Sequence, residues 1–186
     1  MKPYVTLKNY SYLMSNNQSD NLNILKAFKG ANFIDKVALI LSIWFGAGLL
    51  PAMPGTFGTA GAIPLYLLID FLHIRYQALF LLILIVVAIW SSHRSQYILG
   101  TVDPGAIVID EVAGFLLIII FIPFTLRNLI AAFFLFRFFD ILKPLPIKMI
   151  EKKVKGGFGI VFDDLVAGLY AYLSLRILLY MIEWWD

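Results

Sequence analysis

The sequence predicts an all-α integral membrane protein: a bundle of about four to five transmembrane helices with a re-entrant or interfacial segment near the amino terminus. Two observations support this fold class. First, 61% of the 186 residues are hydrophobic and the mean hydropathy is +0.85, whereas a soluble domain is nearer half apolar. Second, long apolar stretches alternate with short polar or basic ones. Because so few residues are polar, they cannot cover a surface that faces water on all sides. Lipid must therefore cover part of the protein surface.

Composition also excludes several classes of protein. The chain has no cysteine, which excludes a disulfide framework, a thiolate metal site and a cysteine nucleophile. The net charge of +3 is small, and the basic and aromatic residues do not alternate in a soluble patch. No nucleic-acid partner is therefore expected. Residues 1–36 are polar and do not read as a cleaved signal peptide. We expect them to form a tail or surface helix ahead of one membrane-embedded domain, residues 37–186.

The helices are predicted from the apolar stretches in order. Val37–Leu50 is short for a membrane span and runs into glycines and prolines, so it is expected to be interfacial or re-entrant. Five helices follow, and Pro144 and Pro146 end the fourth. Polar residues 91–105 and basic residues 148–159 are expected to be connections. The predicted helices are Phe57–Leu72, Ala78–Trp90, Val112–Phe124, Leu129–Leu142 and Asp164–Ile182.

Basic residues orient this bundle. Because successive helices alternate in direction, twelve of the fifteen lysines and arginines fall on the side where the first predicted helix begins. Only Arg75 and Arg127 lie on the other side. Positive charge marks the cytoplasmic side of membrane proteins, so this face is predicted to be cytoplasmic and the carboxyl terminus external.

Acidic residues gather at the same predicted face. Acids at membrane depth are rare, and like charges raise each other's pKa, so nearby cations are expected. Arg137 and Lys143 lie three residues before and after Asp140, on one helical face if the helix continues that far. The alternative is that the acids only cap helices or pair at the interface, but three clusters on one face favour a site. The five acids are Asp110, Glu111, Asp140, Asp163 and Asp164.

The charge balance predicts a metal. Five carboxylates set against Arg94, Arg137 and Lys143 leave a formal charge that one divalent cation cancels. Ligands that are all oxygen favour Mg²⁺ or Mn²⁺ over zinc. We therefore predict a Mg²⁺ site formed by the five acids.

Two glycine-containing segments are candidates for phosphate binding. Pro54–Thr59 precedes a predicted helix, with Thr56 as a candidate N-cap, and Gly156–Gly159 precedes Asp163. Helix N-termini and glycine-rich backbone bind phosphate, although either segment alone is equally well explained as a flexible connection. His93 is a candidate general acid, or else an interfacial histidine. The predicted substrate-binding residues are Gly55, Thr56, His93, Arg94 and Gly157.

Five short segments along the chain have the residues of known motifs, in the same order. The segments are Pro54–Thr59, Ile107–Gly114, Phe136–Ile147, Gly156–Ile160 and Asp163–Gly168. Their sequences and their order resemble the phosphatidylglycerophosphatase A family. The resemblance covers roughly Val37 to Leu175, and His93-Arg94 and Asp103 also fit it. Thr59 stands where a serine is usual in the family, and Leu145 where a tryptophan is usual.

The resemblance implies an activity, a substrate and a location. It implies a Mg²⁺-dependent lipid phosphatase of a bacterial inner membrane, which removes the terminal phosphate of phosphatidylglycerophosphate and leaves phosphatidylglycerol. No sequence motif for a phosphorylated nucleophile is visible, so attack by metal-activated water is the simpler mechanism. The five acids would then hold metal or orient water, while Arg94, Arg137 and Lys143 would neutralise the phosphoryl oxygens.

The alternative function is a small divalent-cation transporter or channel subunit, which would use the same acids as an ion path. A transporter predicts acids near the membrane midplane, whereas these acids cluster at one face. The clustering favours the enzyme. Oligomeric state, the number of metal ions and the identity of the general base are not predicted.

Overall fold

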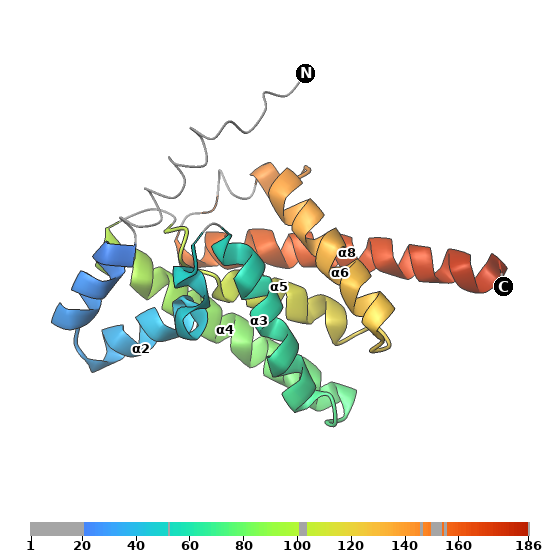
Figure 1. The fold of residues 1–186 in the computed structure, drawn as a ribbon, viewed down its shortest axis with the longest axis horizontal. Coiled ribbons are helices and arrows are strands. Elements are labelled where there is room, and N and C mark those ends of the chain that lie inside the picture. Colours follow the sequence, from blue (N-terminus) through green and yellow to red (C-terminus); the bar gives the residue numbers. More distant parts are fainter. Residues whose placement is uncertain are drawn as a thin grey trace, which may run out of the picture.

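The computed structural model describes residues 21–51, 53–100, 104–145, 147–149, 154 and 156–185, with side chains to Met181. Within these residues the fold is all helical, as predicted (Figure 1). Residues 21–30 are helical and precede the labelled elements. These are α2 (Phe33–Ser42), the 3₁₀ helix η1 (Trp44–Leu49), α3 (Pro54–Ile69), α4 (Ile74–Leu99), α5 (Ile109–Ile119), α6 (Leu126–Leu142) and α8 (Gly157–Trp185).

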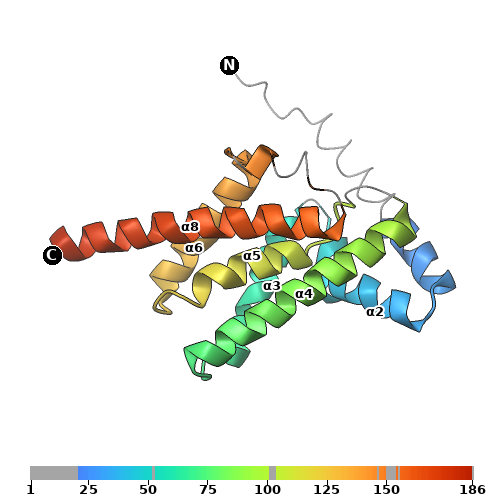
Figure 2. The same cartoon turned by 180° about the vertical axis from the view of Figure 1, so that it is seen from behind.

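Helix α5 forms the centre of the fold. It contacts α3, α4, α6 and α8, and Figure 2 shows α8 and α4 lying along opposite sides of it. Val112, Phe115 and Leu116 on this helix are fully buried. A helix that is apolar on every side is typical of a core position. Nine of the eleven residues of α5 are buried, so protein encloses most of this helix and fixes its first turn relative to its neighbours.

Two glycines let α5 and α8 approach closely. A Cβ atom on Gly168 would lie 2.4 Å from the Gly114 carbonyl oxygen, and one on Gly114 would lie 2.7 Å from the Asp164 carbonyl oxygen. Both neighbours are backbone atoms, which cannot rotate away as a side chain can. The absence of side chains at these positions therefore sets the separation of the two helices.

Replacing Gly168 with alanine is expected to destabilise the protein. Overpacking costs about 1–3 kcal/mol, whereas alanine gains only about 1 kcal/mol over glycine in helix propensity, so the melting temperature in detergent should fall. Gly30→Ala is the matched control, because no atom lies within 4 Å of a Cβ there. Equal melting temperatures for the two variants would contradict the close packing described here.

Helix α4 is longer than the sequence predicted. It continues to Leu99 and ends at Gly100, which has a φ of 66°, so the expectation of a connection over residues 91–105 is wrong for its first nine residues. The serines responsible for the polar pattern face inward: Ser95 is buried and its hydroxyl lies 2.8 Å from that of Ser42. Residues 101–103, which include Asp103, lie outside the described residues.

The segment between α2 and α3 reverses direction instead of continuing as one helix. Trp44, Phe45 and Gly46 all have positive φ values, and the Trp44 indole donates a hydrogen bond to the Gly61 carbonyl at 3.2 Å. The expectation that Val37–Leu50 is interfacial or re-entrant in a membrane stays a prediction. Residues 21–30 form a helix whose Ile24 is buried beside Ile43, and the predicted division between a tail and a membrane domain also stays a prediction.

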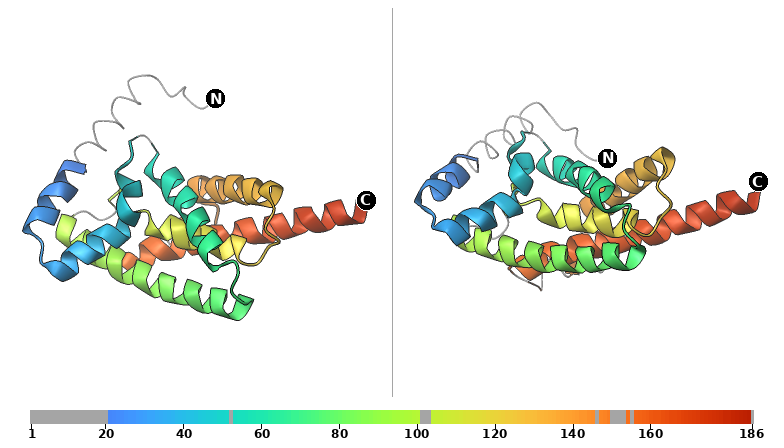
Figure 3. Two further views of the ribbon diagram at one scale, coloured as in Figure 1. Left: turned by 60° about the horizontal axis from the view of Figure 1, so that its bottom comes forward. Right: turned by 90° about the horizontal axis from the view of Figure 1, so that it is seen from below.

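Two helices are long and apolar enough to cross a membrane, Ile74–Leu99 and Gly157–Met181. Helix α3 is apolar but shorter. The carboxyl-terminal half of α8 extends beyond the other helices (Figure 3). The coarse prediction, an all-helical chain with apolar helices of membrane-spanning length, is therefore confirmed, while four to five spans stay a prediction.

Candidate functional site

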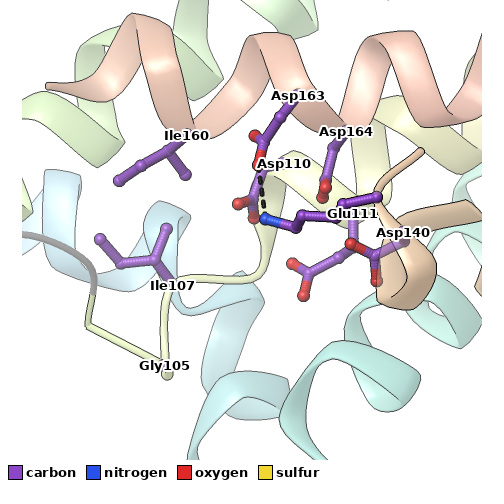
Figure 4. A pocket seen from close by; sticks show the side chains of 9 residues that line it. Gly105, Ile107, Asp110, Glu111, Asp140, Ile160, Asp163 and Asp164 are labelled. Atoms are coloured by element: carbon purple, nitrogen blue, oxygen red, sulfur yellow. Dashed lines mark hydrogen bonds and ion pairs between the residues drawn. The ribbon is translucent and has the colours of Figure 1, made fainter. Parts of the chain in front are cut away.

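An acidic pocket of about 140 Å³ lies between the start of α5, the end of α6 and α8, and the first turn of α3 lies next to it. The helices alternate in direction as predicted, so the first turns of α3, α5 and α8 and the end of α6 lie at the same end of the bundle (Figure 1). Figure 4 shows the carboxylates pointing into the shared space. The pocket is lined by Gly105, Ile107, Asp110, Glu111, Asp140, Lys143, Ile160, Asp163 and Asp164.

Helix α5 supplies Asp110 and Glu111 from its first turn, and α8 supplies Asp163 and Asp164. The expectation that the second pair opens its helix is wrong, because α8 begins at Gly157. Gly156, at a φ of 80°, turns the chain, and a Cβ on Gly157 would lie 2.3 Å from the Ile89 carbonyl oxygen. The glycines thus allow the chain to pass close to α4. Helix α8 therefore begins before the predicted start at Asp164.

The two cations of the site hold carboxylates. Arg137 donates a hydrogen bond to Asp140 at 2.6 Å within α6, as the spacing predicted. Lys143 does not share that face, because α6 ends at Leu142 and Lys143 has a φ of 44°. Its ammonium instead donates to the Asp163 carboxylate of α8 at 2.7 Å, the dashed contact in Figure 4. Lys143 therefore links α6 to α8.

Three acids have the geometry of a metal site. Asp110, Glu111 and Asp164 each offer one carboxylate oxygen, and these oxygens lie within 4.8 Å of one another. Ligands about 2.1 Å from Mg²⁺ lie at most about 4.2 Å apart, so the three oxygens would have to move slightly closer together to bind this ion. Oε2 of Glu111 is buried and has no hydrogen-bond partner among the described residues. A buried carboxylate oxygen in this state fits a cation ligand, because leaving it unsatisfied is costly.

The amino terminus of α3 lies against Glu111 and Arg137. A Cβ on Gly55 would lie 2.4 Å from Oε1 of Glu111 and 3.0 Å from Nη1 of Arg137. The helix starts at Pro54 with Met53 as its N-cap, so the expectation that Thr56 is the N-cap is wrong. Proline suits the first helical position because it has no N–H to leave unpaired, and this shifts the start by two residues.

His93 and Arg94 do not line the pocket. The Arg94 guanidinium donates to the Asp35 carboxylate of α2 at 2.5 Å, and the exposed His93 ring lies beside Gly156. Their predicted contact with substrate, and that of Gly157, stays a prediction. The sequence analysis did not anticipate the pairing of Asp35 with Arg94, since 59 residues separate them.

Without Arg94 the pocket is more acidic than the charge balance predicted. Among the described residues, five carboxylates line it together with Lys143, and Arg137 pairs with one of them from behind. These described groups carry a formal excess of three negative charges. Gly105, Ile107 and Ile160 also line the pocket and were not among the predicted site residues. Ile107 and Ile160 lie in two of the segments that resemble the family, and this position was the one indication in the sequence that they belong to the site.

The fold and the site define a helical protein in which a buried acidic cluster at one end of the bundle can bind a metal. The family model described as phosphatidylglycerophosphatase A matches residues 40–179. The chain belongs to the phosphatidylglycerophosphatase A family. Membership confirms the prediction of a lipid phosphatase, a phosphoric monoester hydrolase.

Curated relatives agree with this family. The chain is 35% identical over 161 residues to phosphatidylglycerophosphatase A of Haemophilus influenzae, covering 83% of this chain and 96% of the relative. It is 35% identical over 147 residues to phosphatidylglycerophosphatase A of Escherichia coli, covering 78% and 84%. A Bacteroides thetaiotaomicron protein provisionally named phosphatidylinositol-3-phosphatase is also 35% identical, covering 75% and 91%. No solved structure matches the chain.

Proposed function

We propose that this chain hydrolyses the terminal phosphate of phosphatidylglycerophosphate, giving phosphatidylglycerol and inorganic phosphate, with Mg²⁺ held in the acidic pocket. The observation that carries the proposal is the convergence of Asp110, Glu111 and Asp164 from two helices onto one small space. Oxygen ligands alone favour Mg²⁺.

The residues of the pocket divide into three proposed roles. Asp110, Glu111 and Asp164 would hold the cation, which when bound supplies Lewis-acid polarisation of the phosphate and lowers the pKa of water. Asp140 and Asp163 position the two bases, because they accept hydrogen bonds from Arg137 and Lys143. Lys143 lines the pocket and Arg137 lies behind Asp140, and these two cations would neutralise the phosphoryl oxygens as charge develops on them.

The first turn of α3 is proposed to bind the phosphate. Helix N-termini favour anions. In this first turn Pro54 has no N–H, and the N–H groups of Thr56 and Phe57 donate to the Met53 carbonyl, so the Gly55 N–H is the proposed donor. Gly55 also brings the helix end against Glu111 and Arg137, and the phosphate would lie alongside that contact, with Thr56 beside it.

We propose that the helices lie in the bacterial inner membrane with the pocket at the cytoplasmic face and that the remaining apolar helices complete four to five spans. The described lysines and arginines at the pocket end outnumber those at the other end, which supports this orientation. A phosphate ester on a lipid headgroup lies at the level where helix ends meet water, so the bilayer itself would deliver the substrate.

The experiment that tests the function is phosphate release by the purified protein from vesicles, with Mg²⁺ or with EDTA. Activity is expected on phosphatidylglycerophosphate, to vanish in EDTA, to return with Mg²⁺ and to be poor with Zn²⁺. Phosphatidylinositol 3-phosphate is the matched lipid, since one relative is named for it. Full activity in chelator would refute the metal mechanism, and preference for the inositol lipid would refute the proposed substrate.

The divalent-cation transporter is the weaker alternative. Its ion path would need acids spaced along the membrane-crossing helices. In the structure the acids of α5, α6 and α8 instead line one pocket at one end of the bundle. Mg²⁺ uptake by vesicles that contain the protein, without phosphate release, would favour the alternative.

A further inference from the structure

A second pocket lies at the amino-terminal side of the fold, apart from the acidic one. It is an apolar groove of about 320 Å³ between the helix of residues 21–30 and the α2–η1 segment, and every residue that lines it is apolar or glycine. Its volume lies within the range of about 300–1,000 Å³ typical of ligand pockets. Side chains that line it include Ile24, Phe28, Ile40, Ile43, Phe45 and Leu49.

Positive charge lies at this groove. The Lys36 ammonium is 5.6 Å from the ring centroid of Phe28, which lines the groove, and the exposed Lys29 follows Phe28 in the same helix. The single acidic side chain of residues 21–50 is Asp35, which is paired with Arg94. Within residues 21–50, therefore, an apolar floor is combined with an excess of cationic side chains.

Exposed apolar side chains border the same segment. Phe33 is 80% exposed and Phe45 is 71% exposed, although burial of such rings is strongly favourable. Lysines beside exposed phenylalanines on short helices are typical of segments that lie in the membrane interface. The segment thus has the chemistry of a surface that meets both acyl chains and headgroup phosphates.

We propose that this groove binds an anionic phospholipid, with one acyl chain along the apolar floor and the headgroup phosphate on Lys36 and Lys29. Neutral lipids would gain the apolar contact but lack the charge pairing, so the surface selects acidic lipids. No residue of the groove lines the acidic pocket, and the two lysines precede the residues matched by the family model. The inference is therefore independent of the catalytic proposal.

The test measures lipid binding to the purified full chain in neutral detergent by native mass spectrometry. The probes are phosphatidylserine, which is neither substrate nor product of the proposed reaction, and phosphatidylcholine with identical chains. Each basic residue near an anionic lipid surface contributes about fivefold in affinity. Phosphatidylserine should therefore bind at least about fivefold more tightly, and Lys29→Glu with Lys36→Glu should abolish the preference. Lys148→Glu, the same change at another exposed lysine, should retain it.

A second variant tests the groove itself. Ile40→Trp adds bulk to the groove wall without changing charge, so both lipids should bind at least about fivefold more weakly. Unchanged binding in the lysine and tryptophan variants would overturn the proposal. It would also fail if Asp164→Asn removed the binding, which would place the lipid in the acidic pocket. Binding that required deletion of residues 2–20 would show that the chain's own tail occupies the groove.

Discussion

Asp164→Asn is expected to lower the rate of phosphate release by at least about a hundredfold. The substitution keeps the side-chain volume but removes one of the three carboxylates that surround the proposed cation. A hundredfold loss corresponds to about 2.7 kcal/mol of transition-state stabilisation, the scale of one lost electrostatic contact in an active site. Turnover on vesicles at saturating Mg²⁺ measures it.

The same variant should fold normally, which separates chemistry from packing. Asp164 is buried among other carboxylates, so removing its charge relieves repulsion and should not lower the melting temperature. Asp70→Asn is the same exchange at the far end of α3, where the exposed carboxylate accepts a hydrogen bond from Tyr66. It should leave the rate unchanged. Near wild-type turnover in Asp164→Asn would refute the assignment of Asp164.

Gly55→Ala is expected to reduce turnover by about a hundredfold with little change in stability. The new methyl group would lie 2.4 Å from Oε1 of Glu111 and 3.0 Å from Nη1 of Arg137, so both side chains must move. They are flexible ends, so the fold can accommodate them, but misplacing a reacting geometry by about 1 Å can cost about a hundredfold in rate. Phosphate release and melting temperature on one preparation measure both effects.

Gly30→Ala is again the matched control, since open space surrounds that position. It should leave the rate intact. If Gly55→Ala were fully active, Glu111 and Arg137 would not need their described positions, and the proposed phosphate site at α3 would lose its support.

The acidic cluster was predictable because it depends only on helix alternation. Asp110, Asp140 and Asp164 each lie near a helix end, and successive antiparallel helices bring those ends to one side of the bundle. Approximate helix bounds suffice for this inference. That is why the convergence survived errors of several residues in where individual helices begin.

The ion pairs were less predictable because they depend on where a helix stops. Lys143 was expected beside Asp140, but α6 ends one residue earlier and the side chain reaches Asp163. Arg94 was expected in the pocket, but it lies on the part of α4 that faces Asp35. Such partners follow from the packing of distant segments, which hydrophobic periodicity in one sequence does not specify.

Apolar composition also did not separate a lipid-facing helix from one enclosed by protein. The stretch from Val112 was predicted as a span like the others, yet Val112 and Phe115 in α5 are fully buried. A run of hydrophobic residues has the same pattern in a helix that faces lipid and in a helix enclosed by protein. Helix length could still distinguish a lipid-facing helix from an enclosed one, but the prolines and glycines near the helix ends make the length hard to predict.

The brevity of α5 bears on how a lipid reaches the acids. Eleven residues of helix rise about 16 Å, roughly half of a hydrocarbon layer about 30 Å thick. A bilayer accommodates elements shorter than its hydrocarbon layer by thinning locally, so the headgroups around this end of the bundle would be drawn towards the first turn of α5. The phosphate would then meet the pocket wall at Ile107 and Ile160 at its own level. Entry would need little vertical movement of one lipid against its neighbours.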